Sequence, residues 1–214
     1  MTATATTNSY VFSFKDGDGK NKKLLGGKGA NLCEMTQIGI NVPPGFVIST
    51  EACLSYLETE KRELPADLMA QVREQVKMLE QDTGRGFGDV DNMLLLSVRS
   101  GSALSMPGMM DTILNLGLNS QTLPGLIKQT GNERFAWDAY RRFIQLFGKV
   151  ALGIADEEFD KPFDAIKKRE GITEDTDLTA DNCREISDVF LDVVHGETGK
   201  PFPEDVYEQL QLSI

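Results

Sequence analysis

Two cationic side chains, Arg99 and Lys28, stand beside glycine-containing segments, an arrangement suited to binding anions. An apolar run of strand length ends at Arg99, and a loop of small residues follows it before a second apolar, strand-like run begins at 112. A guanidinium offers a planar fork that can bind two oxygens of one phosphate. An ordinary hairpin with an exposed arginine would explain the same segment equally well, so the motif alone leaves both interpretations open.

Lys28 lies within Gly26-Gly27-Lys28-Gly29, and apolar residues follow at helical spacing from 32 to 38. This pattern predicts that the glycines lie at or just before a helix N-terminus, where exposed amides and the helix dipole suit a phosphate. The segment is not a P-loop, because Gly29 follows the lysine, and it is not a dinucleotide fingerprint, because Leu32 replaces the third glycine. Phosphate contact and a plain glycine-rich loop both remain open here.

Composition narrows the classes of partner and compartment. The 214 residues include 33 acidic and 22 basic side chains, so the net charge of −11 argues against a nucleic-acid-binding surface. No apolar run approaches the roughly 20 residues of a membrane span. Three cysteines without a Cys-x-x-Cys pair, and the single His195, argue against a zinc site or a disulfide framework. We expect a cytoplasmic protein with no membrane partner and no metal ligands of its own in this chain.

The first 118 residues alternate strand-like and helical patterns, which predicts a sheet with covering helices. Residues 1–9 are expected to form a disordered leader, and 10–14 a strand whose following turn, 16–20, makes a hairpin. That turn begins like a calcium loop, but Asn21 and Gly27 stand where an EF-hand needs glycine and glutamate.

Strand patterns vanish after 118, and amphipathic helices replace them. We expect a helix over 132–147 capped by Asn132, a second over 160–169 with Pro162 in its first turn, and a third capped by Asp181. The predicted class is α+β, with an α/β part over 10–118 and a helical subdomain over 119–202. Residues 203–214 read as the start of a helix that is not terminated, which predicts that the chain is a fragment.

Several segments together resemble the pyruvate, phosphate dikinase family, within the phosphoenolpyruvate-utilising enzymes. The resemblance covers essentially everything from Tyr10 to Leu212, and the loop at 105–112 is its most discriminating feature. The segments that carry the resemblance are 24–32, 42–46, 97–101, 105–112 with its continuation 113–117, and 201–203. The region that they resemble is the N-terminal part of an ATP-grasp nucleotide-binding domain.

The resemblance implies an enzyme that uses ATP and orthophosphate to phosphorylate a histidine, which then phosphorylates pyruvate to phosphoenolpyruvate, leaving AMP and pyrophosphate. Lys28 and Arg99 would be the catalytic cations on the ATP phosphates, and the loop from Ser100 to Asp111 would lie over them. The nucleotide-contacting residues so implied are Gly26, Gly27, Lys28, Gly29, Arg99, Ser100, Gly101, Ser105, Met106, Gly108, Met109, Asp111 and Thr112.

Other parts of the family's machinery are expected beyond Ile214. These are the purine contacts, the carboxylates that bind Mg2+, the phosphohistidine and the pyruvate site, so this chain alone is not expected to turn over. His195 is expected to be an exposed residue near a helix end, and the parent enzyme is expected to be a homo-oligomer. Two alternatives remain: a stand-alone, non-catalytic nucleotide-binding or regulatory module, and a helical interaction protein with a degenerate site.

Overall fold

The computed structural model describes residues 9–101 and 111–214. Contacts divide the chain into two compact units. The first contains the chain up to Gly84 together with the segment that begins at Ser100, and the second contains Arg85–Arg99 and Asp111–Ile214. None of the described helices is long and apolar enough to cross a membrane. The predicted ranges 10–118, 119–202 and 203–214 stay predictions.

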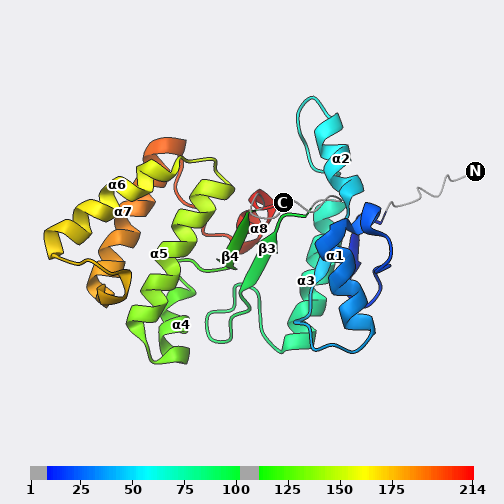
Figure 1. Cartoon of the computed structure of the whole chain (residues 1–214), viewed down its shortest axis with the longest axis horizontal. Coiled ribbons are helices and arrows are strands. Elements are labelled where there is room, and N and C mark those ends of the chain that lie inside the picture. The colour runs from blue at the N-terminus through cyan, green and yellow to red at the C-terminus, as the bar shows by residue number, and fades with distance from the viewer. Residues whose placement is uncertain (1–8, 102–110) are drawn as a thin grey trace, which may run out of the picture. The chain divides into compact units, whose positions relative to one another are not determined.

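The first unit is a two-stranded antiparallel sheet covered by helices (Figure 1). Its elements in chain order are β1 (Val11–Ser13), α1 (Lys22–Gln37), β2 (Phe46–Ile48), α2 (Thr50–Glu58) and α3 (Leu68–Thr83). Phe12 of β1 lies opposite Val47 of β2. Both residues pack on the buried side chains of Leu25, Ala30 and Cys33 from α1. One part of the core of this unit therefore lies between α1 and the sheet. Helix α3, which contacts β1, adds the buried side chains of Leu68, Val72, Val76 and Leu79.

The predicted hairpin after the first strand is wrong, because β1 pairs with β2 and the turn at 16–20 leads into α1 instead. The glycines of this turn allow its backbone to pack closely against α1. A Cβ on Gly17 would lie 2.6 Å from the Cys33 sulfur, and one on Gly19 would lie 2.8 Å from the Glu34 Cβ. The Gln37 amide donates to the Gly17 carbonyl at 2.7 Å. The turn thus packs on one face of α1 and is hydrogen-bonded to it.

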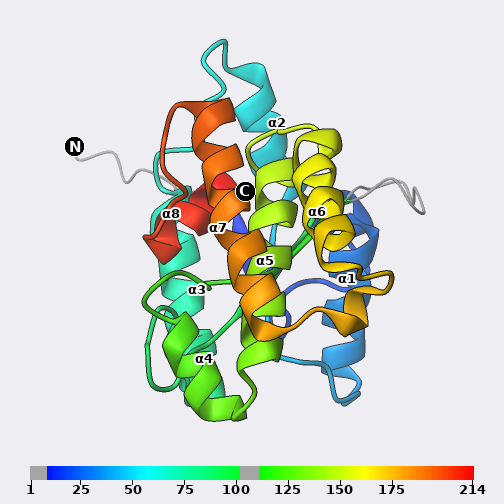
Figure 2. The same cartoon turned by 90° about the vertical axis from the view of Figure 1, so that its left-hand side faces the viewer.

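The second unit combines a β-hairpin with helices. Its elements in chain order are β3 (Leu96–Arg99), β4 (Thr112–Leu116), α4 (Leu123–Thr130), α5 (Glu133–Val150), α6 (Asp156–Glu170), the 3-10 turn η1 (Asp175–Asp177), α7 (Ala180–Thr198) and α8 (Val206–Leu212). The antiparallel pairing of β3 with β4 confirms the two strand-like runs around the small-residue loop. Figure 2 shows α5, α6 and α7 running side by side, with α7 packed on both α5 and α6.

The helical predictions for this unit are confirmed, with corrections at two helix starts. Asn132 caps α5 by accepting from the Phe135 amide at 3.0 Å. Helix α6 begins at Asp156 rather than 160, so Pro162 lies inside the helix and not in its first turn. Helix α7 is capped by Thr179 rather than Asp181, because Thr179 and Asn182 form a reciprocal capping box.

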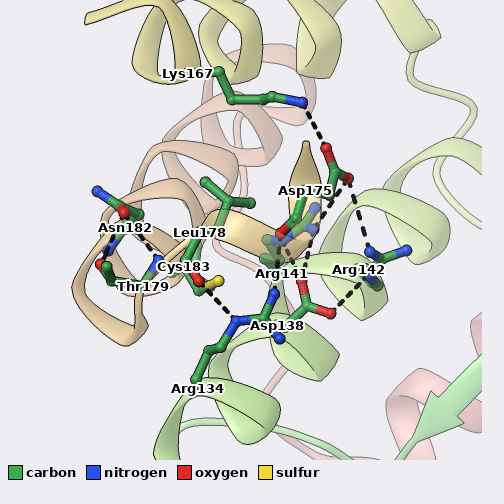
Figure 3. Close-up of polar contacts among 11 residues, drawn as sticks. Arg134, Asp138, Arg141, Arg142, Lys167, Asp175, Leu178, Thr179, Asn182 and Cys183 are labelled. Carbon is green, nitrogen blue, oxygen red and sulfur yellow. Dashed lines mark hydrogen bonds and ion pairs between the residues drawn. The ribbon is translucent and has the colours of Figure 1, made fainter. Parts of the chain in front are cut away.

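An ion cluster around the buried Arg141 side chain links η1 to α5 and α6 (Figure 3). The Arg141 side chain is 2% exposed, and its Nη2 lies 2.6 Å from a carboxylate oxygen of Asp138 and 3.4 Å from one of Asp175. Lys167 Nζ lies 2.7 Å from the other Asp175 oxygen. The Arg141 guanidinium also lies over the Phe163 ring, 4.9 Å from its centroid. Each buried charge therefore has a partner, as burial requires.

The α+β class is confirmed, but the strands form two separate two-stranded sheets rather than one sheet. The two sheets have different neighbours within their own units. The Gln71 Oε1 accepts from the amides of Tyr10 and Val11, at 2.8 and 3.3 Å, and so covers the start of β1. On β4, Ile113 and Leu116 are buried, and this strand packs on α5. The ATP-grasp type of sheet stays a prediction.

Candidate functional site

Gly26 interrupts α1 and creates a new helix start inside the glycine-rich segment. Its φ of 68° and ψ of 165° fall in a region that is essentially restricted to glycine, and the residue is buried. The helix resumes at Gly27. In a helix that starts there, the first amides have no carbonyl of the same helix to bind. The predicted placement of the glycines at a helix start is therefore confirmed, with the break after Leu25.

Gly29 has a packing role that the sequence did not reveal. A Cβ at this position would lie 2.8 Å from Cγ1 of Val47, closer than real side-chain contacts allow. The glycine therefore lets α1 approach β2. Lys28, one position earlier, is exposed. Its Nζ lies 3.4 Å from the backbone carbonyl oxygen of Ser100, to which it donates.

Arg99 is the last residue of β3 and pairs with Thr112 in the hairpin register. The side chain of Arg99 is exposed. Within residues 9–101 and 111–214, its guanidinium has no ion-pair partner, and the same holds for the Lys28 ammonium. Each of them is thus an exposed cation without an acidic partner in the described ranges, in a chain of net charge −11, and each by itself is available to an external anion.

The structure brings together only part of the predicted set. Gly26, Gly27, Gly29 and Lys28 share one turn of α1, and Lys28 reaches Ser100 in the same unit. Arg99, Asp111 and Thr112 belong to the second unit, so their joint contact with one nucleotide stays a prediction. Gly101 is described and exposed. The predicted contacts Ser105, Met106, Gly108 and Met109 lie outside the described residues.

Other titratable residues have no visible part in this site. His195 is exposed in the last turn of α7, as expected. All three cysteines are free thiols, and burial raises the pKa of Cys33 and of Cys183. Within the described ranges, no group of three or more His, Cys, Asp or Glu side chains could hold a metal ion.

Sequence reasoning missed a buried amide that anchors the end of β4. The fully buried Gln209 side chain accepts from the Gly117 amide at 3.0 Å and donates to the carbonyls of Leu118 and Pro203, at 3.0 and 2.9 Å. A polar residue between Val206 and Leu210, on the apolar face of the last helix, was the available signal. Gln209 thereby fixes α8 to the hairpin that carries Arg99.

Comparison with known sequences first gives the class of this region. A family model described as "Pyruvate phosphate dikinase, AMP/ATP-binding domain" matches residues 22–64, which include the glycine-rich segment and Lys28. The chain is therefore similar to a nucleotide-binding domain, in agreement with the helix start and with the exposed lysine found there, which has no acidic partner in the described ranges.

The relatives then give the particular protein that the chain resembles. It is 52% identical over 204 residues to the pyruvate, phosphate dikinase of Entamoeba histolytica, covering 95% of this chain and 23% of that protein. It is 45% identical over 206 residues to the enzyme of Clostridium symbiosum, covering 96% and 24% respectively. The chloroplastic enzyme of Mesembryanthemum crystallinum is 47% identical over 215 residues, covering 99% and 22%.

These matches confirm the resemblance to the N-terminal part of pyruvate, phosphate dikinases. The chain spans about a quarter of the length of these curated relatives.

Proposed function

We propose that the chain is the N-terminal nucleotide-binding part of a pyruvate, phosphate dikinase, and that Lys28 and Arg99 bind the phosphates of ATP. The observation that carries the proposal is the exposed Lys28 ammonium, directly after the break at Gly26, within the segment that matches an AMP/ATP-binding domain. The amides of the resumed helix and the lysine charge would act on the same anion.

The two cations would contribute differently to phosphoryl transfer. This reaction depends mainly on positioning the phosphates and neutralising charge on their oxygens. The Lys28 ammonium is a compact charge that can turn among several oxygens, whereas the Arg99 guanidinium can bind two oxygens in a fixed plane. Gly27, which is not buried, lacks a side chain that would keep a phosphate away from the backbone, whereas the buried Gly26 contributes through the break in the helix.

For the whole protein, we propose the conversion of ATP, phosphate and pyruvate to AMP, pyrophosphate and phosphoenolpyruvate through a phosphohistidine. The 214-residue chain would bind nucleotide without turnover. His195 is not proposed as the phosphorylated histidine, because its Val-Val-His-Gly-Glu segment lacks the surroundings that the family resemblance implies. The resemblance also implies Mg2+, but the described residues contain no group of three or more His, Cys, Asp or Glu side chains that could hold it.

We also propose a cytoplasmic location, supported by three unpaired cysteines, and a homo-oligomeric parent enzyme, which rests on the resemblance alone. Targeting of this protein to chloroplasts, the location that the names of several relatives give for those enzymes, would contradict the first of these proposals.

Calorimetric titration of the purified chain with ATP tests the nucleotide proposal. Losing a hydrogen bond to a charged group costs about 1.5–3 kcal/mol, so Lys28→Met and Arg99→Met should each weaken binding by about tenfold to a hundredfold. Lys22→Met is the matched control, since Lys22 is exposed on the same helix, and it should bind like the wild type. Wild-type affinity in both site variants would refute the assignment. Formation of AMP and pyrophosphate by the chain alone would refute the lack of turnover.

A further inference from the structure

The Lys28 ammonium has a contact within the protein that phosphate binding does not explain. It donates to the Ser100 carbonyl, 72 positions away in the sequence. Ser100 directly follows β3, and it groups with Lys28 in the first unit, whereas Arg99 groups with the second. The bonded carbonyl therefore lies where the chain leaves one compact unit and enters the other.

The chemistry of an ammonium allows this contact and phosphate binding at the same time. A lysine carries three donors in a rotatable group. One donor on the Ser100 carbonyl leaves two for phosphate oxygens. Lys22 and Lys23 lie on the same helix and are also exposed, yet neither ammonium has a hydrogen-bond partner in the described ranges. The contact is therefore particular to Lys28.

We propose that Lys28 is a positioning residue for the exit of β3, because its ammonium holds the Ser100–Gly101 peptide in place before nucleotide is bound. This inference deepens the proposed function, since it adds a second task to the lysine proposed to bind phosphate. The contact lies within the first unit, so its effect is on the Ser100–Gly101 peptide itself. Less backbone freedom would then be lost when nucleotide binds.

NMR spectroscopy of the isotope-labelled 214-residue chain, without nucleotide, tests the contact directly. In Lys28→Met, the Ser100 carbonyl carbon should shift upfield because it loses a donor. The order parameter of the Gly101 amide, which belongs to the same peptide, should fall toward about 0.6 or below, the range of flexible backbone. Lys28→Arg keeps a donor and should restore both signals, and Lys22→Met should leave both at wild-type values. Unchanged Ser100 and Gly101 signals in Lys28→Met would overturn the inference.

Parallel ATP titrations separate this inference from the proposed function. If Lys28→Met loses ATP affinity but keeps wild-type Ser100 and Gly101 signals, the positioning role is wrong and phosphate binding stands. If the two NMR signals change while ATP affinity stays at the wild-type value, phosphate binding by Lys28 is wrong; the hold on the Ser100–Gly101 peptide then stands, but its contribution to nucleotide affinity is refuted. The amide signals of Ala30 and Cys33, buried in the same unit, must match the wild type to show that the variant is folded.

Discussion

Replacing Gly26 with alanine tests whether the glycine-rich segment depends on the break in α1. At φ 68° and ψ 165°, an alanine would be held in a backbone region that costs about 1–3 kcal/mol. Cys33 is fully buried in the core next to this break, so its thiol reacts with a labelling reagent only when the first unit opens. The strain should accelerate Cys33 labelling by about 5- to 150-fold, since 1.4 kcal/mol is about tenfold.

The other two cysteines serve as internal controls in the same experiment. Cys53 is exposed and should react at once in every variant, whereas Cys183 is buried in the second unit and should keep its wild-type rate in Gly26→Ala. Gly196→Ala is the matched substitution, because Gly196 lies inside α7 with open space around it. Alanine there should stabilise the helix by up to about 1 kcal/mol and slow Cys183 labelling. Wild-type labelling of Cys33 in Gly26→Ala would refute the argument that this position requires glycine.

Three further predictions concern the second unit, whose unfolding the single tryptophan reports by fluorescence. Burial raises the pKa of Asp175, but the Lys167 hydrogen bond and charge outweigh it and hold that pKa below its usual range. The ionised Asp175 therefore stabilises the folded state above about pH 4, and this stabilisation is lost as the pH falls through the lowered pKa. An Asp175→Asn variant whose stability falls with acid in the same way as that of the wild type would contradict this. Gln209→Leu should cost more than about 2 kcal/mol in urea unfolding, since it leaves three backbone groups unpaired, while the exposed Gln211→Leu stays near wild type. Tyr140→Phe should not lower the urea midpoint, because the buried hydroxyl has no hydrogen-bond partner in the described ranges; a clear loss of stability would mean that it has one.

Local patterns predicted elements well where one physical signal dominates. The apolar stripe of α5, together with the Asn132 cap, specifies that helix within a single stretch of sequence. Strand pairing was not predictable in the same way. β1 and β2 are separated by the whole of α1, and the turn at 16–20 has the composition of a hairpin turn. Only the contacts of Gly17 and Gly19 with α1 show why the chain enters a helix there.

The candidate site shows the same limit. Gly26 and Lys28 could be selected from residue types, because glycine and lysine at a helix start have few chemical interpretations. The Ser100 carbonyl could not be selected, since every residue has such an oxygen and its partner lies 72 positions away. The buried position of the Gln209 side chain was likewise not predictable, because an amide side chain within a helical pattern is more often exposed than buried.

Gly29 and Lys28 together explain why a lysine can be presented to solvent at this place. Successive residues of a helix point about 100° apart, so the direction of one determines the direction of the next. Gly29 faces Val47 so closely that α1 can pack on β2 only with glycine at this position. That packing sets the rotation of the helix about its axis, and Lys28 is thereby turned away from the sheet, toward solvent and the Ser100 carbonyl. The glycine-rich segment is thus required for packing as well as for any phosphate, and a Gly29→Ala variant should displace the lysine even where it leaves the helix intact.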